Sequence, residues 1–98
     1  MRAQDLRDAE TLWGALMQEG ARQVAKTALA SQIRTTGLES TLRWLDSKSV
    51  PLRDALCNAL NIPTDRHARG QRTNLELLSD SRRALALADA LHLVARAR

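Results

Sequence analysis

The stretch at residues 33–48, with the sequence IRTTGLESTLRWLDSK, gives the clearest fold signal in the chain. Gly37 separates two segments, and leucines then recur at positions 38, 42 and 45. Spacings of four and three residues put these leucines on one face of an α-helix. Ser47 and Ser49 then indicate a turn. The stretch predicts two helices that meet at a glycine.

The composition extends this prediction to the whole chain. Its 98 residues include 17 Leu and 16 Ala, but only 3 Val and 2 Ile and no Phe or Tyr. Leu and Ala favour helices, whereas strands are rich in the β-branched and aromatic residues that are scarce here. We therefore expect an all-α protein, a compact bundle of five to six short helices. The expected helices are about 4–19, 21–36, 38–48, 50–61 and 73–96, with a possible break at 79–81.

Length and cysteine content limit the kind of protein. A chain of this size is one domain by length, here a helical domain over residues 1–98 with a basic loop at about 62–72. Cys57 is the only cysteine, so no internal disulfide can form. The chain lacks an apolar run like a signal peptide or a membrane span. We expect a cytoplasmic protein that does not contact membranes.

No group of residues in the sequence supports catalysis. His67 and His92 stand outside any spacing typical of a metal site, so we expect no metal and no other cofactor. Cys57 falls at the edge of an apolar helix face, as buried structural cysteines do. Most carboxylates have a helix neighbour of opposite charge; examples are the pairs Glu39–Arg43, Arg43–Asp46 and Asp80–Arg83. We expect the protein not to be an enzyme.

The basic residues are unevenly distributed. The net charge is +4, and 13 of the 15 basic residues are Arg. On the predicted helix 21–36, Arg22, Lys26 and Arg34 share the face opposite the apolar one, which suits a phosphate backbone. Three further arginines, including Arg69 and Arg72, lie in the basic loop. Both Trp residues fall on or near core stripes, so we expect phosphate contacts without base stacking and with little sequence preference.

A DNA-binding helix-turn-helix fits the stretch around Gly37 poorly. With Gly37 as the turn glycine, a small residue is needed four positions earlier, where Ile33 stands. Apolar residues are needed directly before Gly37 and six positions after it, where Thr36 and Arg43 stand. Three mismatches count against this reading.

The same stretch resembles a known family instead. Residues 33–38, then Thr41-Leu42, Leu45 and Ser47-Lys48, are similar to the signature of the small subunit of type III-B (Cmr) CRISPR–Cas effector complexes. That signature has Asn where Thr36 stands. Residues 2–5 resemble the family's first helix and residues 83–95 its last, without its usual Trp-Leu-Lys-Arg element. The small subunit of another CRISPR effector type is a related reading.

The resemblance implies a helical, non-catalytic subunit. Such subunits stack in several copies along the backbone subunits of the complex, beside its large subunit, and hold guide RNA and target nucleic acid on a basic face. By position, the residues of that face include Arg22, Lys26, Arg34 and Arg43. The full set of candidate nucleic-acid-binding residues is Arg22, Lys26, Arg34, Arg43, Lys48, Arg69 and Arg72.

Two other functions remain open from the sequence. A small DNA-binding regulator with a helix-turn-helix-like element would read DNA through the helix at 38–48. A helical bundle that only binds other proteins, such as an antitoxin or adaptor, would bind no polyanion.

Overall fold

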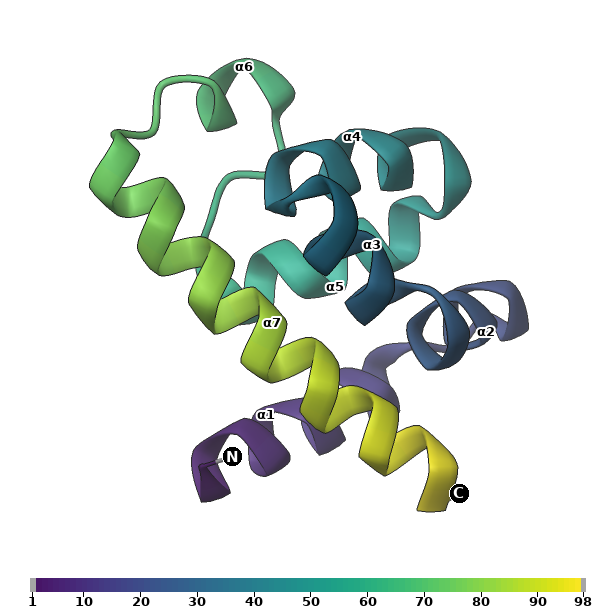
Figure 1. Cartoon of the computed structure of the whole chain (residues 1–98). Helices are drawn as coiled ribbons and strands as arrows, with labels where there is room; N and C mark the ends of the chain where they lie inside the picture. The colour runs from purple at the N-terminus through teal and green to yellow at the C-terminus, as the bar shows by residue number, and fades with distance from the viewer. Residues whose placement is uncertain (1, 98) are drawn as a thin grey trace.

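Residues 2–97 are described by the computed structural model, and every regular element among them is a helix. The all-α prediction is confirmed, although residues 2–97 form seven helices rather than five to six (Figure 1). They are α1 (Ala3–Ala15), α2 (Glu19–Thr27), α3 (Leu29–Thr36), α4 (Leu38–Lys48), α5 (Val50–Leu60), α6 (Arg66–Arg69) and α7 (Asn74–Ala97). The Cα radius of gyration is 12.2 Å, close to the value of about 13 Å for a compact chain of 100 residues.

Local signals in the sequence set the bounds of α4, α5 and α7. Gly37 has φ 88°, a conformation that glycine adopts without strain, and α4 begins directly after it. Ser49 caps α5 by accepting a hydrogen bond from the amide of Leu52, and Asn61 ends α5 in the left-handed conformation. A capping box begins α7, because Thr73 and Glu76 exchange two hydrogen bonds.

The predicted helix over residues 21–36 is wrong, because the structure divides it at Ala28. Ala28 has φ −124° and ψ −24°, outside the helical region. Its amide still bonds to Val24 and its carbonyl to Gln32, both at 2.9 Å, so the bend loses little backbone hydrogen bonding. Likewise, the expected ranges 4–19 and 21–36 place the first boundary at Gly20, whereas α1 ends at Ala15 and Gly20 lies inside α2.

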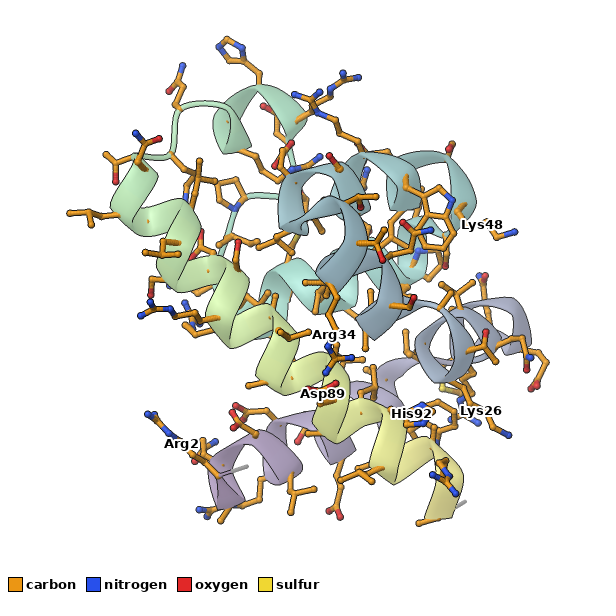
Figure 2. The ribbon with its side chains drawn as sticks, in the orientation of Figure 1. Arg2, Lys26, Arg34, Lys48, Asp89 and His92 are labelled. Carbon is orange, nitrogen blue, oxygen red and sulfur yellow. The ribbon has the colours of Figure 1, made fainter. Side chains whose placement is uncertain are left out.

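Helix α7 runs the length of the molecule and contacts α1, α2, α3, α4 and α5 (Figure 1). Its 24 residues correspond to about 36 Å at 1.5 Å per residue, against a longest dimension of 37 Å. An ion pair between Arg34 and Asp89 also joins α3 to it (Figure 2). The possible break at 79–81 is absent, so α7 is one continuous helix.

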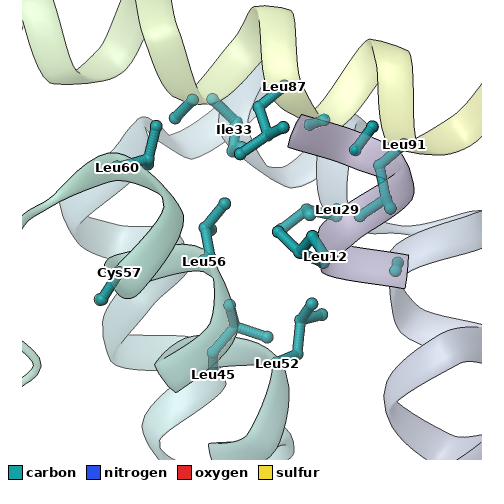
Figure 3. Packing of buried hydrophobic residues seen from close by; sticks show 14 of the residues in the cluster. Leu12, Leu29, Ile33, Leu45, Leu52, Leu56, Cys57, Leu60, Leu87 and Leu91 are labelled. Atoms are coloured by element: carbon teal, nitrogen blue, oxygen red, sulfur yellow. The ribbon is translucent and has the colours of Figure 1, made fainter. Parts of the chain in front are cut away.

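The core lies between α7 and the other helices. Leucines from five helices meet there, among them Leu12, Leu29, Leu45, Leu56 and Leu87 (Figure 3). Small residues of α7, including the fully buried Ala84, Ala88 and Ala90, allow its neighbours to approach closely. No described helix combines the length and the apolar character that crossing a membrane requires.

Candidate nucleic-acid interface

Helix α2 stands at one side of the bundle with one face buried and one face open. Ala21, Val24 and Ala25 point into the core, while Gln23 and Lys26 are exposed on the other side. This division follows from the helical period, because positions 21, 24 and 25 fall on one face. The backbone of α2 is joined to α7 by His92, whose Nδ1 lies 2.7 Å from the carbonyl oxygen of Lys26. Since a carbonyl only accepts, Nδ1 carries the proton of this hydrogen bond.

On the α1 side of α2, Arg22 stacks on Trp13. The guanidinium carbon lies 4.9 Å from the ring centroid, and Nη2 donates to the Trp13 carbonyl at 3.4 Å. The Nε atom of Arg22 is buried and has no hydrogen-bond partner among the described residues. Beside the stack is a pocket of about 240 Å³, lined by Trp13, Glu19, Arg22, Gln23, Lys26 and Ala95.

On the other side of α2 lies a larger groove of about 790 Å³, between α2 and the junction of α4 with α5. Trp44 and Lys48, one turn apart on α4, form part of its wall. No Asp or Glu is among its described lining residues, which include the polar side chains of Gln18, Gln23, Thr27 and Ser49. Gln23 borders both this groove and the smaller pocket, so the two lie next to each other across α2.

We call this region the α2 surface; it consists of Arg22, Gln23 and Lys26 of α2, Trp13 of α1, and Trp44 and Lys48 of α4. Lys26 and Lys48 lie exposed on either side of α2 (Figure 2). Neither lysine, nor Arg22, forms an ion pair with a described carboxylate. Their charge is therefore available to a partner outside the chain.

Arg34 and Arg43 are each paired with a carboxylate. Arg34 donates to both carboxylate oxygens of Asp89 at 2.7 Å. It lies on α3, so the bend at Ala28 separates it from the face that carries Arg22 and Lys26. Arg43 is exposed and lies 3.4 Å from Glu39, as the four-residue spacing predicts. The expected pair of Arg43 with Asp46 is absent, since Asp46 binds other arginines.

Residues 62–72, which we call the α6 segment, differ from the basic loop that the sequence suggests. The segment contains the short helix α6, and Arg69 is only 2% exposed. Its guanidinium binds Asp46 at 3.1 Å and Glu39 at 3.4 Å, and it donates to the carbonyl of Thr64. These contacts fasten the segment to α4.

Arg72 fastens the other end of the α6 segment to α7. It binds both carboxylate oxygens of Asp80, the closest at 2.8 Å, and the carboxylate of Glu76 at 3.0 Å. Asp80 is buried, and these contacts satisfy its charge within the fold. Of the seven candidate residues, the structure thus brings Arg22, Lys26 and Lys48 together with free charges. It places Arg34, Arg43, Arg69 and Arg72 in ion pairs.

The two tryptophans are the surface residues that the sequence analysis missed. Both are partly buried and pack against the core, as we expected of residues on or near core stripes, but each also lines one of the two pockets, where we expected no role in stacking. The four-residue spacing of Trp44 and Lys48 was a usable signal. The contact of Trp13 with Arg22 had none, because the two residues lie on different helices.

Within residues 2–97, no group of three His, Cys, Asp or Glu side chains has the arrangement of a metal site. Cys57 is fully buried, and burial raises the pKa of its thiol to about 11, although the charges of Arg69 and Arg53 oppose the shift. A thiol with this pKa is protonated at neutral pH and is a poor nucleophile.

Comparisons of the chain with protein-family models, with curated proteins and with solved structures give no match. Function is therefore inferred from the α2 surface and from the sequence resemblance.

Proposed function

We propose that this protein is a non-catalytic small subunit of a CRISPR RNA-guided effector complex, which holds guide or target nucleic acid by its phosphates. The observation that carries the proposal is the α2 surface. Arg22, Lys26 and Lys48 present three positive charges there, and Glu19 is the single carboxylate among the described residues lining its pockets. Such a surface attracts a polyanion of any sequence, because phosphate contacts carry no base information.

The stretch that resembles the effector family contributes directly to this surface. It forms the second half of α3, the link at Gly37 and α4, and the C-terminal half of α4 carries both Trp44 and Lys48. The link between the helices is a single residue, shorter than the three- or four-residue turn of a DNA-binding helix-turn-helix. This geometry favours the effector-subunit hypothesis over the regulator.

The start of α7 supports membership of a larger assembly. Leu75 is 80% exposed and Leu78 51% exposed, and the two are three residues apart on one side of the helix. Apolar side chains in such a position are covered when a neighbouring protein binds. In the proposed complex, that neighbour is a backbone subunit, the large subunit or another copy of this chain.

Salt-dependent binding of RNA tests the phosphate contacts. We would measure fluorescence anisotropy of a labelled oligonucleotide at several salt concentrations, with the native chain and with Lys26→Gln plus Lys48→Gln. Each lost contact lowers the slope of log affinity against log salt by about 0.7 to 1, so the double variant loses about 1.5 to 2. The matched control is Arg7→Gln plus Arg82→Gln, because it removes two exposed charges outside the α2 surface. Equal losses in both variants would contradict the assignment.

Purification of the tagged protein from its host tests the assembly. We expect recovery of short repeat-derived guide RNAs together with larger subunits. Recovery of one protein partner without nucleic acid would contradict the proposal and support a bundle that only binds proteins.

A further inference from the structure

The α2 surface combines unpaired cations with aromatic rings on both sides of one helix. Trp13, covered by Arg22, borders the pocket on the α1 side, and Trp44 borders the groove on the α4 side. Gln23 lies between them and contributes to both pockets. A strand that crosses α2 at Gln23 would meet an aromatic or guanidinium plane before and after the crossing.

This combination is more than a phosphate-binding surface needs. A duplex keeps its bases stacked inside and offers phosphates outward, so exposed cations alone suffice to bind it. Proteins that bind single strands add aromatic side chains on which unpaired bases stack, next to cations that follow the backbone. Because every base has a flat face, this stacking tolerates any sequence.

The two sides of α2 would stack bases in different ways. Among the described residues, no cation lies over the ring of Trp44, so a base there would contact the indole itself. Trp13 is already covered by Arg22, so a base there would lie on the outer face of the guanidinium, which is planar and stacks well.

The polar groups around the rings also suit a single strand better than an apolar peptide. Lys26 and Lys48 stand beside the two pockets, at positions where they would neutralise phosphates. Gln18, Gln23 and Thr27 offer donors and acceptors without charge in the larger groove. Because no described acidic side chain lines that groove, an anionic strand meets no repulsion there.

We propose that the α2 surface binds single-stranded nucleic acid, with bases stacked on Arg22 over Trp13 and on Trp44, and with Lys26 and Lys48 on the phosphates. The inference rests on the proposed function, that the chain holds nucleic acid, and adds which form of nucleic acid it prefers.

Tryptophan fluorescence tests the stacking at each ring, because the chain has two Trp and no Tyr. Trp13→Phe leaves Trp44 as the reporter, and Trp44→Phe leaves Trp13. Each full-length variant is titrated at low salt with an unstructured single-stranded RNA, with the same sequence as a duplex, and with an abasic strand of equal charge. We expect the single strand to quench both reporters, and to bind about 5- to 100-fold more tightly than the abasic strand.

Replacement of the rings separates stacking from charge. Trp44→Leu keeps an apolar side chain in the wall of the groove but removes the ring, and we expect it to lower affinity for the single strand at least about 5-fold. Trp44→Phe keeps a ring and retains most of the affinity. Circular dichroism confirms that each variant is folded.

Three results would overturn the inference. Equal affinity for all three polyanions without quenching would show a simple phosphate surface, so that stacking is rejected while the proposed function stands. Tighter binding of the duplex would reject single-strand preference in the same way. If none of the polyanions binds, both the inference and the proposed function fail.

Discussion

The α2 surface and the α6 segment carry the same kind of charge but use it differently. Arg22, Lys26 and Lys48 form no ion pair with a described carboxylate. Arg69 and Arg72 each bind two carboxylates, and Arg69 is buried. The two regions contain similar numbers of basic residues. They differ in whether carboxylates lie close enough to pair with them. Paired arginines hold the fold together, and unpaired cations are available to a partner.

The largest effect on stability is expected from Arg69→Ala. The change leaves Asp46 paired with Arg53 alone and Glu39 with Arg43 alone, and it removes the donor to the carbonyl of Thr64. Hydrogen bonds to a charged group contribute about 1.5–3 kcal/mol, and the loss of the buried Arg69 side chain adds the cost of a cavity, so a total loss of about 3–5 kcal/mol is expected. The midpoint of urea denaturation measures the loss.

Arg66→Ala is the matched control for Arg69→Ala. Arg66 lies on the same short helix but is exposed, so its loss is expected to change stability by less than about 0.5 kcal/mol. Labelling of the Cys57 thiol gives a second readout, because this buried group reacts only when the structure opens. Similar denaturation midpoints for the two variants would mean that Arg69 does not hold the α6 segment.

A smaller loss is expected from Asp80→Asn. Asp80 is buried and bonds to Arg72 through both oxygens. Hydrogen bonds to charged groups contribute about 1.5–3 kcal/mol. When the charge of Asp80 is lost, Arg72 keeps its ion pair with Glu76 and can turn toward solvent.

Asp89→Asn breaks an exposed pair with Arg34 and is expected to cost less than about 1 kcal/mol. If Asp89→Asn lowers the free energy of unfolding more than Asp80→Asn does in the same denaturation experiment, burial does not decide how much an ion pair stabilises the protein.

Acid should destabilise the protein through the carboxylates around the α6 segment. Burial alone would raise the pKa of Asp46, but hydrogen bonds from Arg53 and Arg69 and their charges outweigh it and lower the pKa. Hydrogen bonds from Thr73, then the charge of Arg72, lower the pKa of Glu76. A lowered pKa in the folded state gives stability that is present above the ordinary pKa of about 4 and lost as pH falls through the lowered value.

We therefore expect a melting temperature that is constant from neutral pH to about pH 5 and that falls below about pH 4. Asp46→Asn should show a shallower fall than the native chain, because it no longer gains a proton on unfolding. Lys26→Gln plus Lys48→Gln should keep the native profile. Parallel acid profiles for Asp46→Asn and the native chain would contradict the role of Asp46.

The sequence predicted the helices whose ends are set locally. Gly37 and Thr73 mark the starts of α4 and α7 by their own conformation or side chain. The bend at Ala28 had no such signal, because neither Gly nor Pro stands near it and the apolar pattern continues across it. Likewise, the serines near Asp80 suggested a break that the packing of α7 overrides.

The candidate site was predictable in part for a related reason. Periodicity brought Arg22 and Lys26 together on one face. The partners of Arg34 and Arg69 are 55 and 23 residues away in the chain, so only the fold shows that their charges are used. The partial exposure of Trp13 is also a tertiary property, since it depends on how α1 meets α2.

The smallest effect on stability is expected from the lysines of the α2 surface. Lys26→Gln and Lys48→Gln remove exposed charges without a described ion-pair partner, so each is expected to change the free energy of unfolding by less than about 0.5 kcal/mol. The same substitutions are expected to weaken RNA binding, whereas Arg66→Ala should not. Urea denaturation and anisotropy on one set of variants measure both properties. A loss above about 1 kcal/mol in either lysine variant would make that lysine structural, and would remove the distinction between cations that hold the fold and cations that hold a partner.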